Sequence, residues 1–521
     1  MNRRSLVWCI DEDSHVVAVL SFLALESGTI AATIPKRPKA FALCGAALLV
    51  AFLIRWVTVV AGETHEVRVG LVVDHEKLAD GKASFERFVK QIQSQNIAKE
   101  YSFSVLTDDR RGCGVDREQG DGAFVAANLY FKQKITSLFG PMCHSDLEIT
   151  GRLSNQWNII QFNFWRDHRM DIDLQTVVQM STSSAVNFAV NLAALLNALN
   201  WNKVALFTCG KCFDDEDLAA NRYQIVNRVL NTKGMQIVLN RDLTTDEVEQ
   251  PHVLADILNQ TKLQMRIMVP FFGRDLTHYR SFVEAVKISK LDPEQYVTIL
   301  TVFYDKVNVT LPWLDGDQVD EKVKANFDRS IVMVNEYYNS AEAAQFIRSL
   351  SAQDPFNAQG YLQLYESIFV DLTMLEKAAN ASGEAEIFRN GSFVRSMMRN
   401  VQMRGPFGPI YLDGNTQRLS PFAVYYVEPQ ETRPVPFVSI AVTVQDPHSG
   451  EPSMNLVDSD TNTNVSLMAD IPPDMPTCGF NNELCDQSGT IIVIASVMAL
   501  VVAAIIMFII FRKMYVHRSC F

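Results

Sequence analysis

The stretch "WNKVALFTC" (residues 201–209) is an apolar, strand-like run between two helix-like segments. The segment before it repeats apolar residues at helical spacing, at Val186, Phe188, Leu192, Leu195 and Leu196. A helix is expected over residues 217–230, and the strand-like run "MQIVLNRDL" comes next. Strands that alternate with helices in this way predict parallel strands covered by helices.

The same alternation extends in both directions. Upstream, strand-like runs at residues 66–73, 101–109, 135–141 and 159–164 alternate with expected helices over 84–95, 122–132 and 147–156. Downstream, helices over 254–263 and 279–289 precede "QMRIMVPFFG" and "YVTILTVFY". We therefore expect two successive α/β lobes over residues 65–430. A helix over 357–379 should pack back on the first lobe, and residues 405–427 should form a hairpin that finishes the second.

Two such lobes predict a hinged clamshell with a ligand cleft. Ligands of open α/β sheets bind outside the carboxyl ends of the strands. Aromatic residues near predicted strand ends are candidates for lining the cleft, with core packing as the alternative: Phe164, Trp165, Phe271, Phe272, Phe303 and Tyr304.

Two apolar segments predict the topology. Residues 41–60 follow a basic flank and end in small residues, which is typical of a secretory signal within a leader of residues 1–62; an uncleaved signal anchor is the alternative. Residues 490–511 contain no charged side chain and are long enough to cross a bilayer. The tail of residues 512–521 is basic, so it is expected in the cytoplasm. Residues 431–489 read as an irregular connector with a juxtamembrane cysteine loop.

Charge and glycosylation signals agree with an extracellular location. A net charge of −12 leaves no basic surface for a nucleic-acid partner. Five Asn-x-Ser/Thr acceptors lie between the two apolar segments, at Asn259, Asn308, Asn380, Asn390 and Asn464. We therefore expect a plasma-membrane glycoprotein of type I topology, with lipid around residues 490–511.

Nine cysteines are present, and six of them lie between the apolar segments: Cys113, Cys143, Cys209, Cys212, Cys478 and Cys485. An even number in an oxidising compartment predicts disulfides. Proximity favours a Cys478–Cys485 loop, which would either staple the stalk or stiffen it so that movements reach the membrane helix. Cys209 and Cys212 form a C-x-x-C motif, for which a structural disulfide, pairing with another chain and redox exchange stay open. No nucleotide-binding, metalloprotease, hydrolase or kinase motif accompanies it, and no metal set is expected.

Several motifs, in this order, resemble the ligand-binding region of the atrial natriuretic factor receptor family, and receptor guanylyl cyclases in particular. They are "GPMC" (residues 140–143), "WNKVALF", the hairpin "GPFGPIYLDGNTQRLSPFAVYYV" (residues 405–427) and "PPDMPTCGFNNELC" (residues 472–485). The resemblance implies a type I periplasmic-binding-protein-like bilobed ectodomain plus one transmembrane helix. It also implies a Cys113–Cys143 disulfide, a homodimer or a heterodimer with related receptors, and no cofactor except a chloride ion on the amides of Met142 and Cys143.

Only ten residues follow the last apolar segment, which is too few for a kinase-like or cyclase domain. We therefore expect a single-pass receptor for an extracellular peptide or small molecule, without catalytic activity in this chain. The alternatives are a clearance or decoy receptor, a dimerisation partner of full-length receptor cyclases, an incomplete form of such a cyclase and, more remotely, a C-x-x-C redox protein.

Overall fold

A computed structural model describes residues 7–10, 16–19, 64–73, 78–108, 121–165, 174–182, 184–212, 216–272, 275–302, 312–315, 318–335, 340–350, 355–429, 431, 435–444, 452–457, 471–480 and 488–518. The chain divides into two compact units, residues 1–66 with 100–102, and residues 67–99 with 103–521. In the first unit, β1 (Val7–Ile10) and β2 (Val16–Val19) form an antiparallel pair. The expected signal core at residues 41–60 lies outside the described residues.

The first lobe is built on a sheet of five strands in the order β4-β3-β5-β6-β7. These strands are β3 (His65–Leu71), β4 (Tyr101–Leu106), β5 (Ser137–Phe139), β6 (Ile160–Asn163) and β7 (Val177–Gln179). The pairs β3–β5, β5–β6 and β6–β7 are parallel, as the alternation of strands and helices predicts. The helices of this lobe are α2 (Gly81–Gln93), α3 (Gly122–Gln133), α4 (His144–Trp157), α11 (Ala341–Ser349), α12 (Pro355–Ser382), η4 (Ile387–Arg389) and α13 (Gly391–Ser396).

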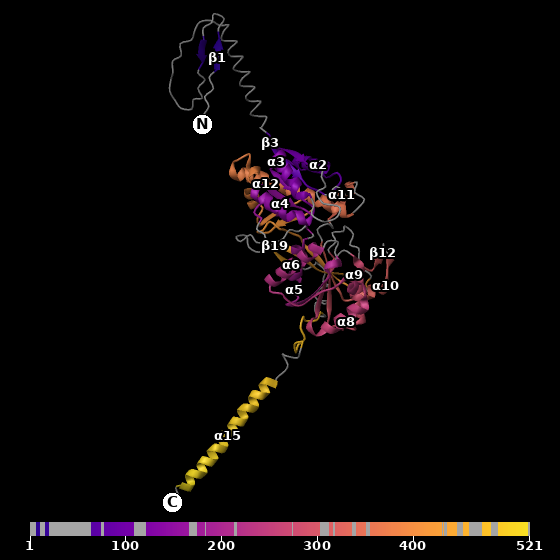
Figure 1. Cartoon of the computed structure of the whole chain (residues 1–521), viewed down its shortest axis with the longest axis vertical. Helices are drawn as coiled ribbons and strands as arrows, with labels where there is room; N and C mark the ends of the chain where they lie inside the picture. The colour runs from indigo at the N-terminus through magenta and orange to yellow at the C-terminus, as the bar shows by residue number, and fades with distance from the viewer. Residues whose placement is uncertain are drawn as a thin grey trace. The chain divides into compact units, whose positions relative to one another are not determined.

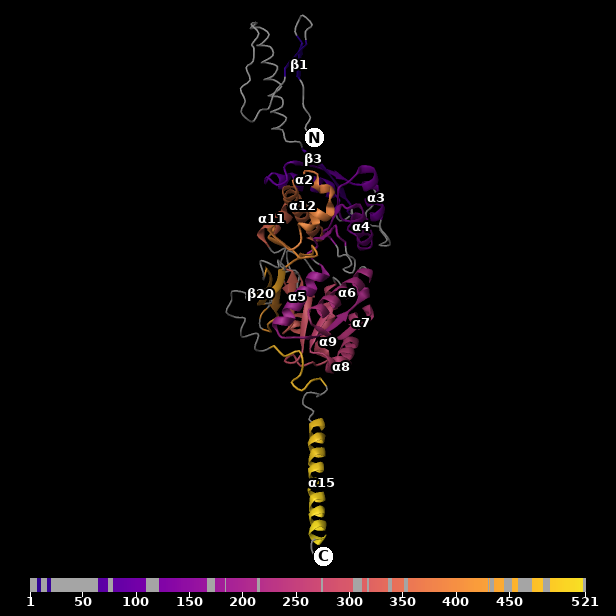
Figure 2. The same cartoon turned by 90° about the vertical axis from the view of Figure 1, so that its left-hand side faces the viewer.

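Helix α12 belongs to the first lobe although it follows the second in sequence. In Figures 1 and 2 the orange α12 lies among the indigo and purple helices α2, α3 and α4. Aromatic side chains fix it there, because Tyr365 of α12 and Phe346 of α11 both lie against Phe88 of α2, with ring centroids 5.0 and 5.5 Å away. The expected return of this helix to the first lobe is confirmed.

The second lobe is built on a sheet of eight strands in the order β20-β19-β18-β14-β11-β10-β8-β9. They are β8 (Lys203–Thr208), β9 (Gln236–Asp242), β10 (Ile267–Phe271), β11 (Val297–Val302), β14 (Ile331–Asn335), β18 (Phe422–Tyr426), β19 (Val435–Val444) and β20 (Pro452–Val457). Its helices are α5 (Ala185–Ala198), η1 (Gly210–Cys212), α6 (Glu216–Thr232), α7 (Thr245–Glu249), α8 (Pro251–Thr261), η2 (Lys262–Gln264), α9 (Leu276–Ile288) and α10 (Glu321–Phe327), with a short hairpin of β12 (Leu314–Asp315) and β13 (Gln318–Val319).

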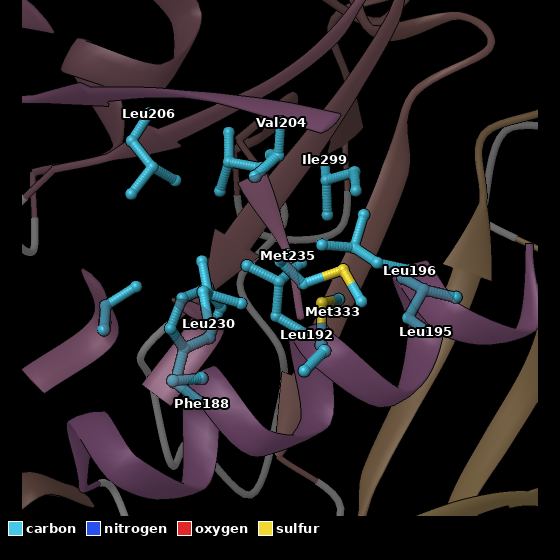
Figure 3. Packing of buried hydrophobic residues seen from close by; sticks show 14 of the residues in the cluster. Phe188, Leu192, Leu195, Leu196, Val204, Leu206, Leu230, Met235, Ile299 and Met333 are labelled. Atoms are coloured by element: carbon cyan, nitrogen blue, oxygen red, sulfur yellow. The ribbon is translucent and has the colours of Figure 1, made fainter. Parts of the chain in front are cut away.

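The stretch "WNKVALF" forms β8, one strand in from an edge of this sheet, and contributes side chains to the core of the lobe. Figure 3 shows Phe188, Leu192, Leu195 and Leu196 of α5 packed toward Val204 and Leu206 of β8, with Ile299 of β11 and Met333 of β14 in the same cluster. Each labelled side chain in this cluster is almost fully buried. Full burial of a Leu or Phe side chain stabilises the fold by about 1.5–3 kcal/mol, so the apolar stripe of α5 anchors that helix to the sheet.

Two sequence expectations were wrong. Residues 405–427 do not simply finish the second lobe: β15 (Val401–Arg404), β16 (Pro409–Leu412) and β17 (Arg418–Leu419) form a separate antiparallel sheet, and only β18 joins the large sheet. The connector expected over residues 431–489 is not irregular throughout, because β19 and β20 extend the large sheet within it. The alternating runs "PFVSIAV" and "SMNLV" lie between polar segments, so the sequence does not clearly mark them as strands.

The last element is the long helix α15 (Ser488–Arg518). Within it, Val493–Arg512 is long and apolar enough to cross a membrane, and none of that stretch is buried against the protein. A helix that is apolar on all sides and exposed on all sides is unsuited to water. The described residues contain one such helix, which fits the expected span at residues 490–511.

Candidate functional site

The two lobes are joined where the end of β7 lies beside the residues just before β17. Gln179 and Gln417 pair as a parallel bridge, and the Gln179 N–H donates to the Thr416 carbonyl at 3.1 Å. From here one segment enters α5 and the other enters β18. Arg395 of α13 reinforces the pair, because its Nε donates to the Val177 carbonyl at 2.7 Å and to Thr416 Oγ1 at 2.9 Å. We call residues 177–182, 184 and 416–420 the hinge.

Buried amides of α5 hold the hinge to the second lobe. Asn187 Oδ1 accepts from the Ser420 N–H at 3.1 Å, and Asn191 Nδ2 donates to the Ser420 carbonyl at 3.0 Å. The Asn187 and Asn191 side chains are fully buried. Buried polar groups of this kind are costly unless paired, so they specify one arrangement of the chain at this point.

Helix α12 holds the hinge to the first lobe. Gln363 Nε2 donates to Thr182 Oγ1 at 3.1 Å. Arg418 Nη1 forms an ion pair with Glu366 Oε2, and both side chains are fully shielded from solvent. Burial raises the pKa of Glu366, and the facing Arg418 guanidinium opposes that rise. The hinge is therefore fixed on both sides by side chains that water does not reach.

The "GPMC" turn lies at the carboxyl end of β5 and leads into α4. Gly140 has φ +90° and a cis bond to Pro141, and a Cβ there would lie 2.1 Å from the Val72 carbonyl oxygen, so only glycine fits. Gln161 Nε2 donates to the Gly140 carbonyl and to Asn163 Oδ1, each at 3.0 Å. Asn163 Nδ2 is buried and has no hydrogen-bond partner among the described residues.

A second group at the carboxyl edge of the first sheet combines a tyrosine, a carboxylate and a tryptophan. Tyr361 of α12 donates its hydroxyl to Asp80 Oδ1, and burial, together with that carboxylate, raises the pKa of Tyr361. The Trp165 ring fills the space beside Gly360, where a Cβ would meet Cζ3 at 2.3 Å. Sequence reasoning found Trp165 but missed Asp80 and Tyr361, which are far apart in the chain.

The predicted aromatic residues are mostly core. Phe164, Phe271 and Phe272 are at most 2% exposed, and Trp165 is 6% exposed. Phe271 packs against Phe188 of α5, and Phe272 packs against Tyr279 and Phe282 of α9. This packing favours the core interpretation for the three phenylalanines. Phe303 and Tyr304 lie outside the described residues.

Cys209 and Cys212 are joined in a disulfide at the carboxyl end of β8. Cys209 is fully buried, and the turn after it is fixed by Asp242, whose Oδ1 accepts from Thr208 Oγ1 at 3.1 Å and from the Gly210 N–H at 3.3 Å. This arrangement favours the structural interpretation of the C-x-x-C motif. Cys143 and Cys478 are also disulfide-bonded, while Cys113 and Cys485 lie outside the described residues. The described residues contain no group of three or more metal-binding side chains.

Two α/β lobes, a hinge of paired crossing segments and strand ends that can face a ligand define a bilobed ligand-binding domain of the periplasmic-binding-protein type. Residues 82–430 match the family described as the receptor family ligand binding region, and the chain belongs to this family.

Two relatives illustrate the kind of receptor in which this region occurs. Receptor-type guanylate cyclase daf-11 of Caenorhabditis elegans is 25% identical over 72% of this chain, and receptor-type guanylate cyclase gcy-8 of the same organism is 25% identical over 80%. The chain spans 33% and 38% of the lengths of these relatives, so it corresponds to about a third of each. The region it shares with them is the ligand-binding part of the receptor.

Solved structures agree on the fold. A putative branched-chain amino acid ABC transporter from Rhodospirillum rubrum aligns with a TM-score of 0.51 at 12% identity. The alignment covers 72% of this chain and 100% of that chain. The expected periplasmic-binding-protein-like fold is confirmed.

Proposed function

We propose that this chain is a single-pass cell-surface receptor that binds an extracellular peptide or small molecule between its lobes. The observation that carries the proposal is the hinge, in which buried side chains of α5 and α12 hold two paired segments between two ligand-binding lobes. Helix α15 supports a membrane span, with the lobes outside the cell. Asn259, Asn380 and Asn390 are exposed, as glycosylation requires, while Asn308 and Asn464 lie outside the described residues.

A ligand screen on the full chain in detergent tests this proposal. The panel contains free amino acids, aromatic carboxylates and a library of secreted peptides, and chloride is exchanged for gluconate in a separate arm. A ligand at 100 times its Kd stabilises the folded state by about 2.7 kcal/mol, which raises Tm by roughly 2–4 °C for a domain of this size. A receptor gives such a shift with at least one class of compound. A panel without any shift, alongside a properly folded chain, argues against ligand binding.

The chloride arm addresses the anion proposed at the "GPMC" turn. Its donors would be the amides of Met142 and Cys143 at the start of α4, where a helix favours negative charge. The unpartnered Asn163 Nδ2 of the neighbouring strand supports a polar ligand near this turn. Gluconate should therefore lower Tm relative to chloride, and bromide should restore it.

A homodimer is the proposed state of the receptor, and a surface on α3 and α4 supports it. Phe124 and Phe131 on α3 and Ile149 on α4 are 52%, 60% and 51% exposed. Tyr130 stacks on Trp157 with ring centroids 4.2 Å apart, and Phe131 meets the same indole edge-on at 5.7 Å. Clustered aromatic residues on an exposed face are typical of protein interfaces.

Phe131→Glu is expected to weaken dimerisation of the full chain by tenfold or more. The reason is that a charge replaces an aromatic anchor, a loss of about 2 kcal/mol at an interface. Sedimentation equilibrium in detergent measures the effect. Leu263→Glu is the matched control, because Leu263 is 61% exposed on the second lobe. Equal dimer affinity in both variants and the wild type would place the interface elsewhere.

A further inference from the structure

The segment just before the membrane helix is attached to the second lobe. Residues 471–480 contact the turn between α5 and β8, at the end of the sheet opposite to the carboxyl ends of its parallel strands. Ile471 packs against the core cluster that contains α5 and β8. These contacts join parts of the chain separated by about 270 residues, as in the Trp201–Pro472 pair with a separation of 271.

Asp474 is the centre of the attachment. Its Oδ2 accepts from the Asn202 N–H at 2.6 Å and from the Lys203 N–H at 2.8 Å. A carboxylate that accepts from two consecutive amides forms charge-assisted hydrogen bonds, which are stronger than bonds between neutral groups. Asp474 therefore binds the backbone where β8 begins.

Side chains on both sides of Asp474 add to this contact. The buried Trp201 donates Nε1–H to the Pro472 carbonyl at 2.9 Å. Lys203 Nζ lies 3.1 Å from Met475 Sδ and 5.9 Å from the centre of the Phe480 ring. Cys478, between these two residues, is held in a disulfide. The segment is thus held along most of its length.

The attachment point is also an end of the helix that holds the hinge. Asn187 and Asn191 of α5 bind Ser420, and α5 then leads directly into Trp201. This helix has 14 residues, and at 1.5 Å per residue it is about 21 Å long. Packing of α5 on the sheet makes it a rigid element between the hinge and residues 471–480.

We propose that residues 471–480 form a strap that ties α15 to the second lobe, so that a movement at the hinge passes through α5 to the membrane helix. The proposal rests on the proposed receptor function, and it assigns the transmission to Trp201 and Asp474. The Asp474 carboxylate is the positioning group of the strap.

Hydrogen exchange of the full chain in nanodiscs tests the strap. Asp474→Asn removes the charge that the Asn202 and Lys203 amides bind, and their exchange is expected to become about tenfold faster. Exchange over residues 471–480 should also rise, while that of β10 and α6 stays unchanged. Glu431→Gln is the matched control, because Glu431 is an exposed carboxylate just after the second-lobe strand β18. Unchanged exchange at Asn202 and Lys203 would overturn the proposal, and so would faster exchange throughout the second lobe.

Asn191→Ala tests the transmission from the hinge. It removes the donor to the Ser420 carbonyl from the middle of α5, about two turns before the end of the helix that leads to the strap. If α5 links the two places, exchange over residues 471–480 changes in this variant while β10 is unaffected. If the strap does not respond, α5 does not carry the movement, and the proposal is wrong. These measurements need no ligand, so their failure is separate from a failure of the proposed ligand binding.

Discussion

Arg418→Met is expected to lower the free energy of unfolding by about 3–5 kcal/mol, because it leaves Glu366 buried without its cationic partner. Both side chains of the pair are fully buried, so solvent does not screen the loss. Tm should fall accordingly, and the hinge should exchange faster. Urea denaturation of the full chain, followed by tryptophan fluorescence, measures the change.

Two further variants show whether the ion pair itself is responsible. Arg404→Met makes the same substitution at an exposed position on β15 and should change the free energy by less than about 0.5 kcal/mol. Glu366→Leu combined with Arg418→Met replaces both partners by apolar groups, and it should recover most of the lost stability. If the double variant is as unstable as the single one, the unpaired carboxylate is not the cause.

The alternation of strands and helices predicts the two lobes because each strand is a nearly continuous apolar run and each helix has an apolar stripe. "WNKVALF" and the stripe of α5 are the clearest case, since both contribute to one core. The return of α12 to the first lobe is also predictable, because its length and aromatic content require a large apolar partner. Such patterns are local and need no knowledge of distant contacts.

The polar part of the site could not be predicted in the same way. Glu366 and Arg418 are 52 residues apart, Asp80 and Tyr361 are 281 residues apart, and nothing in the local sequence marks them as partners. Arg418 lies in the hairpin that resembles the receptor family, but this resemblance does not indicate a buried ion pair. Nothing in the local sequence marks Asp474 as a contact residue either. Its carboxylate nevertheless accepts two short hydrogen bonds from the second lobe.

The strands β19 and β20 show a further limit of sequence reasoning. Proline, serine and threonine around residues 428–474 indicate an irregular connector. The backbone of β19 (Val435–Val444) nevertheless pairs with β18 over Val435–Ile440, because the free edge of a sheet accepts any chain segment that can extend beside it. Tertiary pairing overrides local propensity at such an edge.

Asp371→Asn is expected to stabilise the protein above neutral pH and to have little effect in acid. Asp371 lies on α12 and is 4% exposed, and burial raises its pKa from 3.8 to about 7. Below pH 3.8 both the folded and the unfolded chain hold the proton, so the group contributes nothing. Between pH 3.8 and about 7 the unfolded chain releases the proton while the folded chain keeps it, so stability falls as pH rises.

Above about pH 7 both states are ionised and the destabilisation is constant. At 1.36 kcal/mol for each pH unit, the full effect is roughly 4 kcal/mol. The asparagine is neutral at every pH and has the shape of the protonated aspartic acid. The stability difference between variant and wild type should therefore grow from near zero at pH 4 to roughly 4 kcal/mol at pH 8.

Urea denaturation at a series of pH values measures this difference. Asp256→Asn, at an exposed position on α8, is the matched control and should change the free energy by less than about 0.5 kcal/mol. A difference for Asp371→Asn that is the same at pH 4 and pH 8 would contradict the raised pKa, since only a carboxyl that titrates differently in the two states makes the effect depend on pH. A stability difference that grows with pH would show that ionised Asp371 destabilises the first lobe. Helix α12, which also carries Glu366 and Tyr361, would then hold a buried acid that weakens the fold.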